Sequence, residues 1–422
     1  MLKHFPTKTK FYLAIYFILL CLYAVFSYSL TAPNLVLTTW QPYINFQQTM
    51  WQMLYANQVL TARLFLALAA CLFLTFLLII RSLTNNQKFK LKQKQIIAGA
   101  LIMMLPLILS YNALSRDVFN YLFNAKMVWV YQANPHVKTA LDFARDEWVR
   151  FMHNIHTPAP YGQGWTLLSL IPYWLGQNKF LPSWIIFRLL SMASVLLLIP
   201  LLFKLAGQLS IKLKLSDLGF VLLNPLFLIE IVSNSHNDLW MMLPAMWSFS
   251  LLLERQQEDG TKNLKLVWPA LLFAFSVSIK FATLAILPIW LYLLIRAVKP
   301  GLTTKLLSFI PGLSNWLKLN WPLLVSLLMF LPLLTPRSKQ FLPWYLTWSL
   351  IWLPLIKNKI WKMVLLAFSF SSLLRYFPWI AAGGYSQLVI RQQKIITWTI
   401  PLGALLYLLI YYLFEPDKHP NR

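Results

Sequence analysis

A series of long apolar blocks constrains this chain more than any other feature of its sequence. The blocks run for roughly 15 to 22 residues, the length that a helix needs to cross the hydrocarbon core of a bilayer. Of the 422 residues, 59% are hydrophobic and only 12% are charged, whereas soluble proteins carry about twice that share of charge. The sequence therefore predicts an all-α polytopic membrane protein. Its first block, FYLAIYFILLCLYAVFSYSL (11–30), is interpreted as a retained span because no small-residue cleavage site follows it.

The blocks predict a bundle of about twelve transmembrane helices in one membrane domain (1–422), with both termini on the inner side. Two leading spans and a basic loop (1–95) precede a core (96–348) and the C-terminal spans (349–422). Segment 161–176 fits either a short span or a helix at the membrane interface, and the distribution of basic loops favours the interfacial helix. The predicted spans lie near 11–31, 61–80, 96–112, 183–203, 217–233, 239–253, 267–279, 283–295, 320–335, 343–356, 360–374 and 395–414.

The net charge of +25 comes largely from short loops between the apolar blocks. The positive-inside rule places such loops in the cytoplasm, where they face anionic head groups, so the excess charge requires no nucleic-acid partner. Cys21 and Cys71 both lie inside apolar runs, which predicts neither a disulfide scaffold nor a metal site. The basic loops are at 81–95, 204–214, 254–265, 296–305 and 357–362.

One stretch, residues 112–163, is too polar for a bilayer and predicts an extracytoplasmic loop of about 50 residues, a length usually associated with function. At its start, Asp117, Tyr121 and Asn124 share one helix face. A carboxylate at the membrane edge, beside a hydroxyl and an amide, is suited to act as a general base. The alternative is that Asp117 only caps its helix or pairs with Arg116.

A second polar group lies in NPLFLIEIVSNSHNDLW (224–240). Glu230, Asn234 and Asp238 line one side if the helix continues, and Glu230 would then be an ionisable group within the membrane, which marks a functional candidate. The alternative is that the helix has already surfaced and that Asn237 and Asp238 cap the next one. His236 and Asp238 resemble metal ligands, but no second cluster completes a site, so neither a metal nor a cofactor is predicted.

A third group is cationic. Lys280 stands between two apolar runs and is predicted at the outer tip of a helical hairpin. It either snorkels to the interface or provides a counter-charge for a phosphate. Four further cations reach the same side in this topology, which suggests an anionic lipid: Arg337, Lys339, Arg375 and Arg391.

The order of several short motifs resembles that of the GT-C fold glycosyltransferases, in particular the polyprenol-phosphate-mannose-dependent mannosyltransferases of bacterial envelopes. The motifs are SRDVFNY (115–121), PAPYGQGW (158–165), NPLFLIE (224–230) with HND (236–238), and PWYLTW (343–348), besides the membrane Lys280. The resemblance covers roughly Leu101 to Trp348. Two positions depart from the family pattern: His136 replaces a Tyr after Asn-Pro, and Gln163 replaces a Pro after Tyr-Gly.

The resemblance implies a GT-C-like bundle whose first large external loop begins with the catalytic base, here Asp117. It implies an inverting hexosyltransferase, with mannosyl transfer as one option, that takes its sugar from a polyprenyl-phosphate donor. No P-loop or Gly-rich phosphate cradle is present for a nucleotide. We expect substrate contacts from Arg116, Tyr121, Asn134, His136, Tyr161, Glu230, His236, Asn237, Asp238, Lys280, Arg337, Trp344 and Tyr345.

The predicted setting is a multi-pass protein of the plasma membrane with an extracytoplasmic active site. The acceptor is expected to be an envelope glycan or glycolipid, while the sugar, the linkage and the oligomeric state stay open. Two alternatives remain at this point: a transporter or flippase of lipid-linked sugars, and a glycan ligase or polymerase that uses a lipid-diphosphate donor. A transporter would favour two related halves with broken helices, and the sequence shows no such symmetry.

Overall fold

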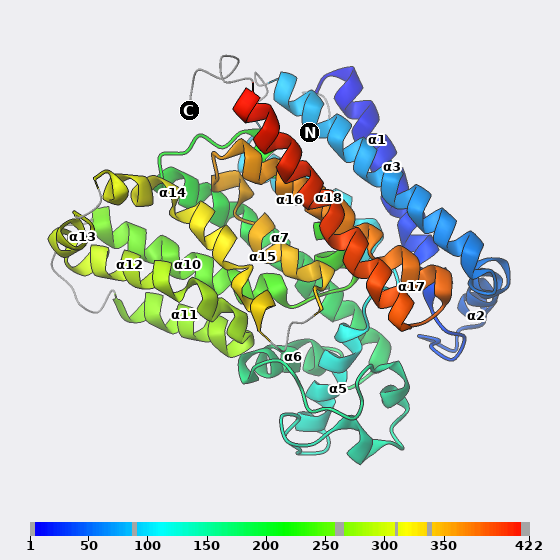
Figure 1. The fold of residues 1–422 in the computed structure, drawn as a ribbon. Helices are drawn as coiled ribbons and strands as arrows, with labels where there is room; N and C mark the ends of the chain where they lie inside the picture. Colours follow the sequence, from blue (N-terminus) through cyan, green and yellow to red (C-terminus); the bar gives the residue numbers. More distant parts are fainter. Residues whose placement is uncertain (1–4, 87–90, 258–265, 309–310, 336–339, 415–422) are drawn as a thin grey trace.

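The protein is described by a computed structural model, which covers residues 5–86, 91–257, 266–308, 311–335 and 340–414. Within these ranges the chain is helical and contains no β-strand (Figure 1). The main helices are α1 (Thr7–Phe26), α2 (Gln41–Met50), α3 (Gln58–Asn85), α4 (Gln93–Ile108), α5 (Asp117–Trp129), α6 (Gln163–Leu175), α7 (Phe180–Gln208), α8 (Leu215–Leu222), α10 (Asp238–Gln257), α11 (Val267–Ile279), α12 (Leu287–Val298), α13 (Pro300–Leu307), α14 (Leu313–Leu328), α16 (Lys359–Leu374), α17 (Tyr376–Ala382) and α18 (Gln387–Phe414).

Shorter helical turns connect or extend these helices. They are η2 (Ser27–Leu30), η3 (Trp51–Tyr55), η4 (Ala140–Phe143), η5 (Glu147–Phe151), α9 (Pro225–Phe227), η6 (Leu228–Ser233), η8 (Phe281–Ile286), η9 (Leu331–Leu334), η11 (Pro343–Leu346), α15 (Thr347–Leu350) and η12 (Leu353–Leu355). In the described part of the chain, seven helical stretches are long and apolar enough to cross a membrane, or eight if a bent pair counts as one span. The prediction of an all-α polytopic membrane protein is therefore confirmed.

The bent pair is the predicted span 217–233. Its two parts, Leu215–Leu222 and Pro225–Ser233, meet at an angle of 43°. The bend follows from the Asn224–Pro225 step, since a proline disfavours helical backbone at the residue before it. The Asn224 side chain accepts hydrogen bonds from the amides of Leu226 and Phe227 and so restarts the helix.

The predicted span 343–356 differs from the others because it is not one continuous helix. It consists of the short turns η11, α15 and η12, and Pro343 and Pro354 stand in the first and last of them. Nearly every residue of this segment is buried within the bundle. Irregular backbone is tolerated at membrane depth where protein rather than lipid surrounds it, which explains the broken segment.

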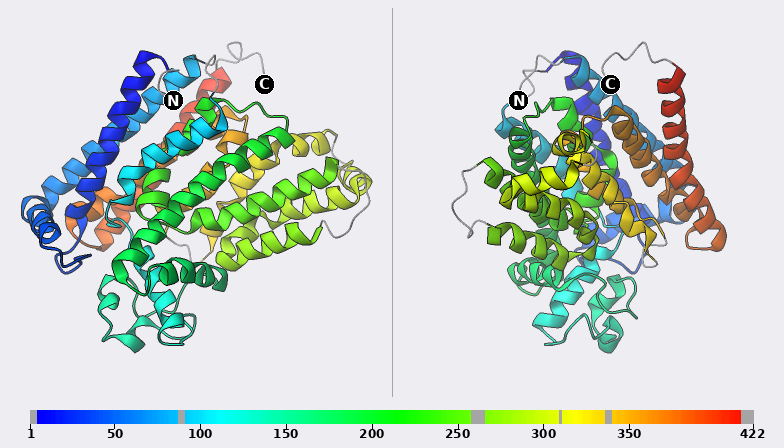
Figure 2. Two further views of the ribbon diagram at one scale, coloured as in Figure 1. Left: turned by 180° about the vertical axis from the view of Figure 1, so that it is seen from behind. Right: turned by 60° about the vertical axis from the view of Figure 1, so that its left-hand side comes forward.

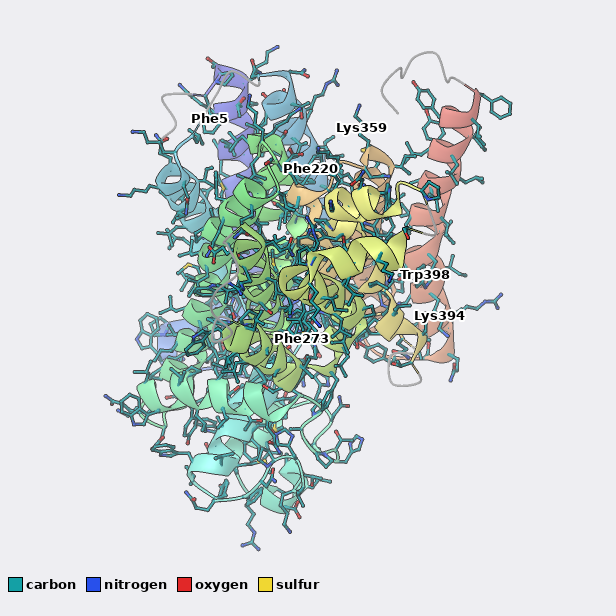
Figure 3. All side chains as sticks on the ribbon, turned by 90° about the vertical axis from the view of Figure 1, so that its left-hand side faces the viewer. Phe5, Phe220, Phe273, Lys359, Lys394 and Trp398 are labelled. Atoms are coloured by element: carbon teal, nitrogen blue, oxygen red, sulfur yellow. The ribbon has the colours of Figure 1, made fainter. Side chains whose placement is uncertain are left out.

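The two ends of the bundle carry different features. At one end, α5, α6 and the loop between them project beyond the bundle (Figure 1), and both views in Figure 2 agree. Lys359 of a basic loop lies at the other end (Figure 3). Two ion pairs involve residues at or near the basic loops: Lys204 with Glu254 at 2.8 Å and Lys362 with Asp217 at 2.7 Å. With 13 residues, α6 is shorter than the roughly 20 residues of a spanning helix.

The last helix, α18, lies at the edge of the bundle (Figure 2). Its Trp398, labelled in Figure 3, packs its ring against Phe368 at 5.2 Å and Phe341 at 5.9 Å. The neighbouring Leu402 and Leu406 are exposed. Exposed leucines on a helix of this length are suited to contact lipid chains.

A fully buried arginine connects three of the helices around the broken span. Arg188 of α7 donates hydrogen bonds to Asn112 Oδ1 at 2.6 Å, to Ser110 Oγ at 2.7 Å and to the Ser233 carbonyl at 2.8 Å, and it also donates to the Leu107 carbonyl. Leu107 stands in the last turn of α4 and Ser233 ends η6, so the guanidinium satisfies carbonyls that helix ends leave free. Arg188 therefore fixes the point from which the chain continues to residues 234–238.

We expect Arg188→Met to destabilise the protein by on the order of 3 kcal/mol, because several buried acceptors would lose their donor. Thermal unfolding in nanodiscs measures this, with Arg150→Met as the control, since Arg150 is exposed and lies over the Phe151 ring. Equal unfolding temperatures for the two variants would contradict the assignment.

Candidate active site

Asp117 is the first residue of α5, where the helix dipole stabilises a negative charge. Its side chain is 19% exposed. The Tyr161 hydroxyl donates a hydrogen bond to Asp117 Oδ2 at 2.7 Å. Among the described residues, Asp117 Oδ1 has no hydrogen-bond partner. Tyr161 therefore fixes Oδ2, and Oδ1 remains available for a further hydrogen bond.

His236 lies between two carboxylates. Its Nδ1 is 3.4 Å from Asp117 Oδ2, and its Nε2 is 3.2 Å from Glu230 Oε2. Both Glu230 and His236 are fully buried. The Glu230 carboxylate also accepts hydrogen bonds from the Asn234 amide at 3.0 Å and the Tyr376 hydroxyl at 2.8 Å. A chain of side chains thus runs from α17 through η6 to the start of α5.

The local backbone explains how Glu230 and His236 come together. After η6 the helix ends, and Ser235 has a φ of 58°, a left-handed conformation that is uncommon for a residue with a side chain. The chain reverses there, and the His236 amide donates to the Glu230 carbonyl at 3.1 Å. The predicted continuous face of Glu230, Asn234 and Asp238 is therefore wrong, because the helix ends before Asp238 and α10 begins at it.

Asp238 belongs to a second cluster with Lys280. The Lys280 ammonium donates to Asp238 Oδ1 at 2.7 Å and to Asn237 Oδ1 at 3.3 Å, and the Trp348 indole also donates to Asp238. Lys280 stands at the break between α11 and η8, which is the predicted hairpin tip. Its ammonium is 5.7 Å from the centre of the Tyr161 ring, so the two clusters adjoin.

Two glycines bring the external loop against this hairpin. A Cβ on Gly162 would lie 2.0 Å from the Ser278 carbonyl oxygen, and a Cβ on Gly164 would lie 2.2 Å from Ser278 Oγ. The Gly162 amide donates to the Ile279 carbonyl at 3.0 Å. Only glycine permits so close an approach, and this contact sets Tyr161 beside both Asp117 and Lys280.

The electrostatic environment keeps Asp117 charged. Burial raises the pKa of its carboxyl, but His236, the Tyr161 hydroxyl and Lys280 together outweigh burial and hold the pKa below its usual value. Burial lowers the pKa of His236, yet Asp117 and Glu230 raise it above its usual value, so the imidazole is protonated at neutral pH. The alternative pairing of Asp117 with Arg116 is not found: no ion pair joins these two described residues, and His236 lies against the carboxylate instead.

The other predicted residues lie around the two clusters, elsewhere in the described structure, or outside the described residues. Tyr121 packs edge-on against Tyr161, with ring centres 5.0 Å apart, and Trp344 stacks on His236 at 4.0 Å. Tyr345 lies beside Lys280, with its ring centre 6.0 Å from the ammonium. These three residues surround the two clusters.

Asn134 and His136 are placed elsewhere in the described structure and contact neither cluster. Asn134 Oδ1 accepts a hydrogen bond from the His136 amide, and the His136 ring is 3.0 Å from Thr166 Oγ1 of α6. Arg375 also lies apart, because it is buried and donates to Thr397 of α18. Arg337, with Lys339, lies outside the described residues.

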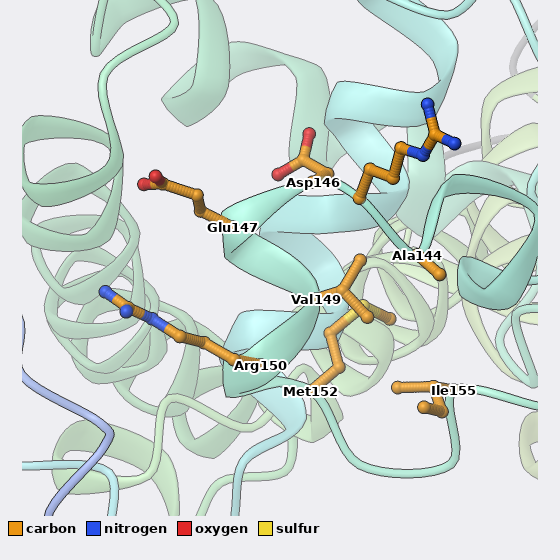
Figure 4. A pocket seen from close by; sticks show the side chains of 8 residues that line it. Ala144, Asp146, Glu147, Val149, Arg150, Met152 and Ile155 are labelled. Carbon is orange, nitrogen blue, oxygen red and sulfur yellow. The ribbon is translucent and has the colours of Figure 1, made fainter.

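A small cleft with a volume of about 40 Å³ opens beside Asp117. Asp117, Asn120 and Asn124 of α5 form one wall, and the segment 152–161 forms the other. A larger hollow of about 480 Å³ lies among residues 144–155 (Figure 4). There Glu147 and Arg150 extend to the same side of their turn (Figure 4), and the neighbouring Asp146 is paired with Lys126 at 2.5 Å. That hollow lacks Asp117 and His236, so the smaller cleft is the candidate site.

Sequence reasoning missed three members of the site. Trp348 and Tyr376 hold Asp238 and Glu230 from distant parts of the chain. Trp348 ends the PWYLTW motif but was not predicted to contact the site, and no local pattern marks Tyr376. Arg188 could have been identified from the sequence, because an arginine inside an apolar block usually has a functional or structural role. In the part of the chain that the structure describes, no group of three or more His, Cys, Asp or Glu side chains is arranged to hold a metal ion.

Comparison with known proteins places the chain in a family. Residues 20–296 match the family described as alpha-(1->6)-mannopyranosyltransferase, N-terminal domain. Comparisons with curated proteins and with solved structures found no match. The matched range covers more than half of the chain and contains Asp117, His236 and Lys280, and it excludes the transporter alternative. The chain therefore belongs to the alpha-(1->6)-mannopyranosyltransferase family and is a membrane glycosyltransferase.

Proposed function

We propose that the protein transfers a hexose, most simply mannose, from a polyprenyl-phosphate donor to an envelope glycan or glycolipid, with Asp117 as the general base. One observation carries this proposal. Asp117 holds one carboxylate oxygen against Tyr161 and His236 and leaves the other without a partner beside an open cleft. An ionised, oriented carboxylate with one free oxygen is what a general base requires.

The reaction follows from this geometry. The acceptor hydroxyl loses its proton to Asp117 Oδ1 while its oxygen attacks the anomeric carbon of the donor sugar. The bond from that carbon to the phosphate oxygen breaks, and polyprenyl phosphate leaves with the electron pair. Attack opposite to the leaving group inverts the anomeric carbon, so an α-linked product, which the family's description names, requires a β-linked donor.

His236 acts through Asp117 in this scheme. Its protonated ring lies against Asp117 Oδ2, and Glu230 holds its other nitrogen. The ring therefore orients the base and favours its charged form, and Glu230, fixed in turn by Tyr376, orients the ring. Both are positioning residues.

Lys280 is suited to stabilise the phosphate as it departs. It is 16% exposed, it is not among the residues that line the cleft, and it lies next to the aromatic residues Tyr345 and Trp348. A cation held in place by Asp238 is already oriented when negative charge develops on the leaving oxygen. Donor and acceptor would thus approach Asp117 from different sides.

The basic loops support an extracytoplasmic site in the plasma membrane. Lys359, in the basic loop at 357–362, lies at the end of the bundle away from α5 and α6 (Figure 3). If the positive-inside rule holds, that end is cytoplasmic and Asp117 faces outward.

The first test replaces the base. Asp117→Asn should fold and insert but lose about a hundredfold or more of the transfer rate, because the amide does not accept the proton. The measurement is the release of polyprenyl phosphate by protein in nanodiscs given polyprenyl-phosphate mannose and a mannoside acceptor. Glu147→Gln is the control, since Glu147 is an exposed carboxylate of the same loop. Wild-type activity in Asp117→Asn would refute the assignment.

The second test is the pH dependence of kcat/KM. Because the pKa of Asp117 is lowered, wild-type activity should persist below the ordinary carboxyl value of about 4 and fall only as pH drops through the lowered pKa. His236→Gln removes the strongest factor that lowers this pKa but leaves burial, so the acid limb should move to higher pH. Because the pKa of His236 is raised, wild type should lose activity only well above pH of about 6.5.

The control for this test is His156→Gln, since His156 is exposed and does not line the cleft. Its profile should equal that of wild type. An unchanged acid limb in His236→Gln would mean that the imidazole does not act on Asp117.

The third test separates the structural role of Lys280 from its proposed role in catalysis. Lys280→Met leaves the fully buried Asp238 without its cation and should destabilise the protein by about 3 kcal/mol. The double variant Lys280→Met, Asp238→Asn removes both charges and should recover most of this stability. Transfer should stay about 10- to 100-fold below wild type in both variants. Recovery of the rate together with stability would assign Lys280 a purely structural role.

A further inference from the structure

A buried arginine at the junction of α16 and α17 has no charged partner among the described residues. Arg375 is only 4% exposed, and it ends α16 at the point where α17 begins. The ion pairs of the described part of the chain do not include it. The surrounding sequence offers no carboxylate either, because no aspartate or glutamate occurs between Asp259 and Glu415. A buried charge is stable only when it is paired, so this guanidinium requires an anion from outside the described structure.

The buried arginine of α7 shows how unusual this setting is. The Arg188 guanidinium donates to four neutral oxygens, which compensate its burial. Arg375 donates to one acceptor among the described residues, Thr397 Oγ1, at 3.2 Å. A guanidinium has five N–H donors, so most donors of Arg375 have no partner in the described part of the chain. None of its nitrogens is both enclosed and unpaired, and the remaining donors are therefore accessible to a ligand.

Hydrogen bonds between α16 and α18 fix the position of Arg375. The Gln393 amide donates to the Arg375 carbonyl at 3.3 Å, and the Ser371 hydroxyl donates to the Thr397 carbonyl at 3.0 Å. The Thr397 hydroxyl, which accepts from Arg375, donates in turn to the Gln393 carbonyl at 2.6 Å. A cation held in this way loses little conformational entropy when a ligand binds.

Arg375 lies near one boundary of the hydrocarbon core. It follows the 16 residues of α16, which begins at Lys359, and at a rise of 1.5 Å per residue the two are about 24 Å apart along the helix axis. Lys359 lies at the end of the bundle away from α5 and α6 (Figure 3). Because a hydrocarbon core is about 30 Å thick, Arg375 lies close to the level of the lipid head groups on the side of α5 and α6.

Two further cations stand on the neighbouring surface of α18. Arg391 and Lys394 are exposed, and with Thr397 they recur every three residues, so the three form one stripe along the helix. In Figure 3, Lys394 lies closer than Lys359 to the end of the bundle that carries α5 and α6. The apolar Ile395 next to Lys394 is exposed as well. The surface therefore offers positive charge beside a face that is suited to lipid chains.

We propose that Arg375 binds the phosphate of an anionic phospholipid at the edge of the bundle, with Lys394 and Arg391 beside it. A phosphate supplies anionic oxygens that match the planar donors of a guanidinium. The acyl chains of such a lipid would lie along the exposed apolar side chains of α18. Arg375 contacts neither the Asp117 cluster nor the Lys280 cluster, so this lipid site is separate from the candidate active site.

The test is the thermal unfolding of purified protein in a neutral detergent, titrated with short-chain phosphatidylglycerol. Wild type should unfold at a higher temperature as the lipid is added, because the lipid binds the folded state. Arg375→Gln removes the charge and should need about tenfold more lipid for half of the increase, which corresponds to roughly 1.4 kcal/mol of lost contact. Without added lipid, Arg375→Gln should unfold at no lower a temperature than wild type, since an uncompensated buried charge is gone.

Two exposed lysines provide a second variant and a control. Lys394→Gln leaves the junction of α16 and α17 intact and should raise the lipid concentration for half of the increase about two- to threefold, as expected for an exposed charge. Lys359→Gln is the matched control, because Lys359 is also exposed but lies at the opposite end of the bundle. Its titration should equal that of wild type.

Three results would overturn the lipid site. Equal stabilisation of wild type by short-chain phosphatidylcholine would mean that the negative charge is not recognised. A lower unfolding temperature of Arg375→Gln without lipid, together with an unchanged titration, would assign Arg375 a purely structural role. Stabilisation through Arg375 by polyprenyl phosphate but not by phosphatidylglycerol would assign this arginine to the donor instead. No sugar is transferred in these measurements, so their result is independent of the proposed function.

Discussion

The site depends on one imidazole held between two carboxylates. His236 joins Asp117 at the start of α5 to Glu230 in η6, and Tyr376 extends the contact to α17. Three segments that are far apart in sequence are thereby fixed around a single ring. Buried charges are stable only when paired, so the arrangement is cooperative: each carboxylate needs the protonated ring, and the ring needs both. The same pairing that stabilises these residues keeps Asp117 ionised and leaves one of its oxygens for chemistry.

Much of the fold was predictable because apolar length and proline position are local signals. The predicted spans fall on helical segments, and the hairpin with Lys280 at its tip is found where the apolar runs meet. The segment 343–356 was predicted as a span, but its prolines and its burial produce short turns instead. Composition reports that a segment is apolar, and it does not distinguish a surface in contact with lipid from one enclosed by other helices.

The candidate site was predictable only in part. The helical spacing of Asp117 and Tyr121 predicted that they share one face of α5. Arg116 was the one partner of Asp117 that the sequence suggested, whereas in the structure His236 lies against its carboxylate. The helical spacing of Glu230, Asn234 and Asp238 suggested one face, but the left-handed Ser235 reverses the chain and sends Asp238 to Lys280. Pairings across 40 to more than 100 residues depend on tertiary packing, which local periodicity does not encode.

Tyr161 lies next to both clusters of the site, the one that contains Asp117 and the one that contains Lys280. The Tyr161 hydroxyl donates a hydrogen bond to Asp117, and the Tyr161 ring lies near Lys280. The neighbouring Gly162 allows the external loop to pack closely against α11. The external loop thus lines the cleft beside Asp117 and also brings Tyr161 near Lys280. An acceptor glycan is soluble in water and a polyprenyl chain is soluble in lipid, so a transferase must let each approach from its own phase. In the proposed reaction, the two substrates would meet at Asp117, whose carboxylate Tyr161 holds by a hydrogen bond.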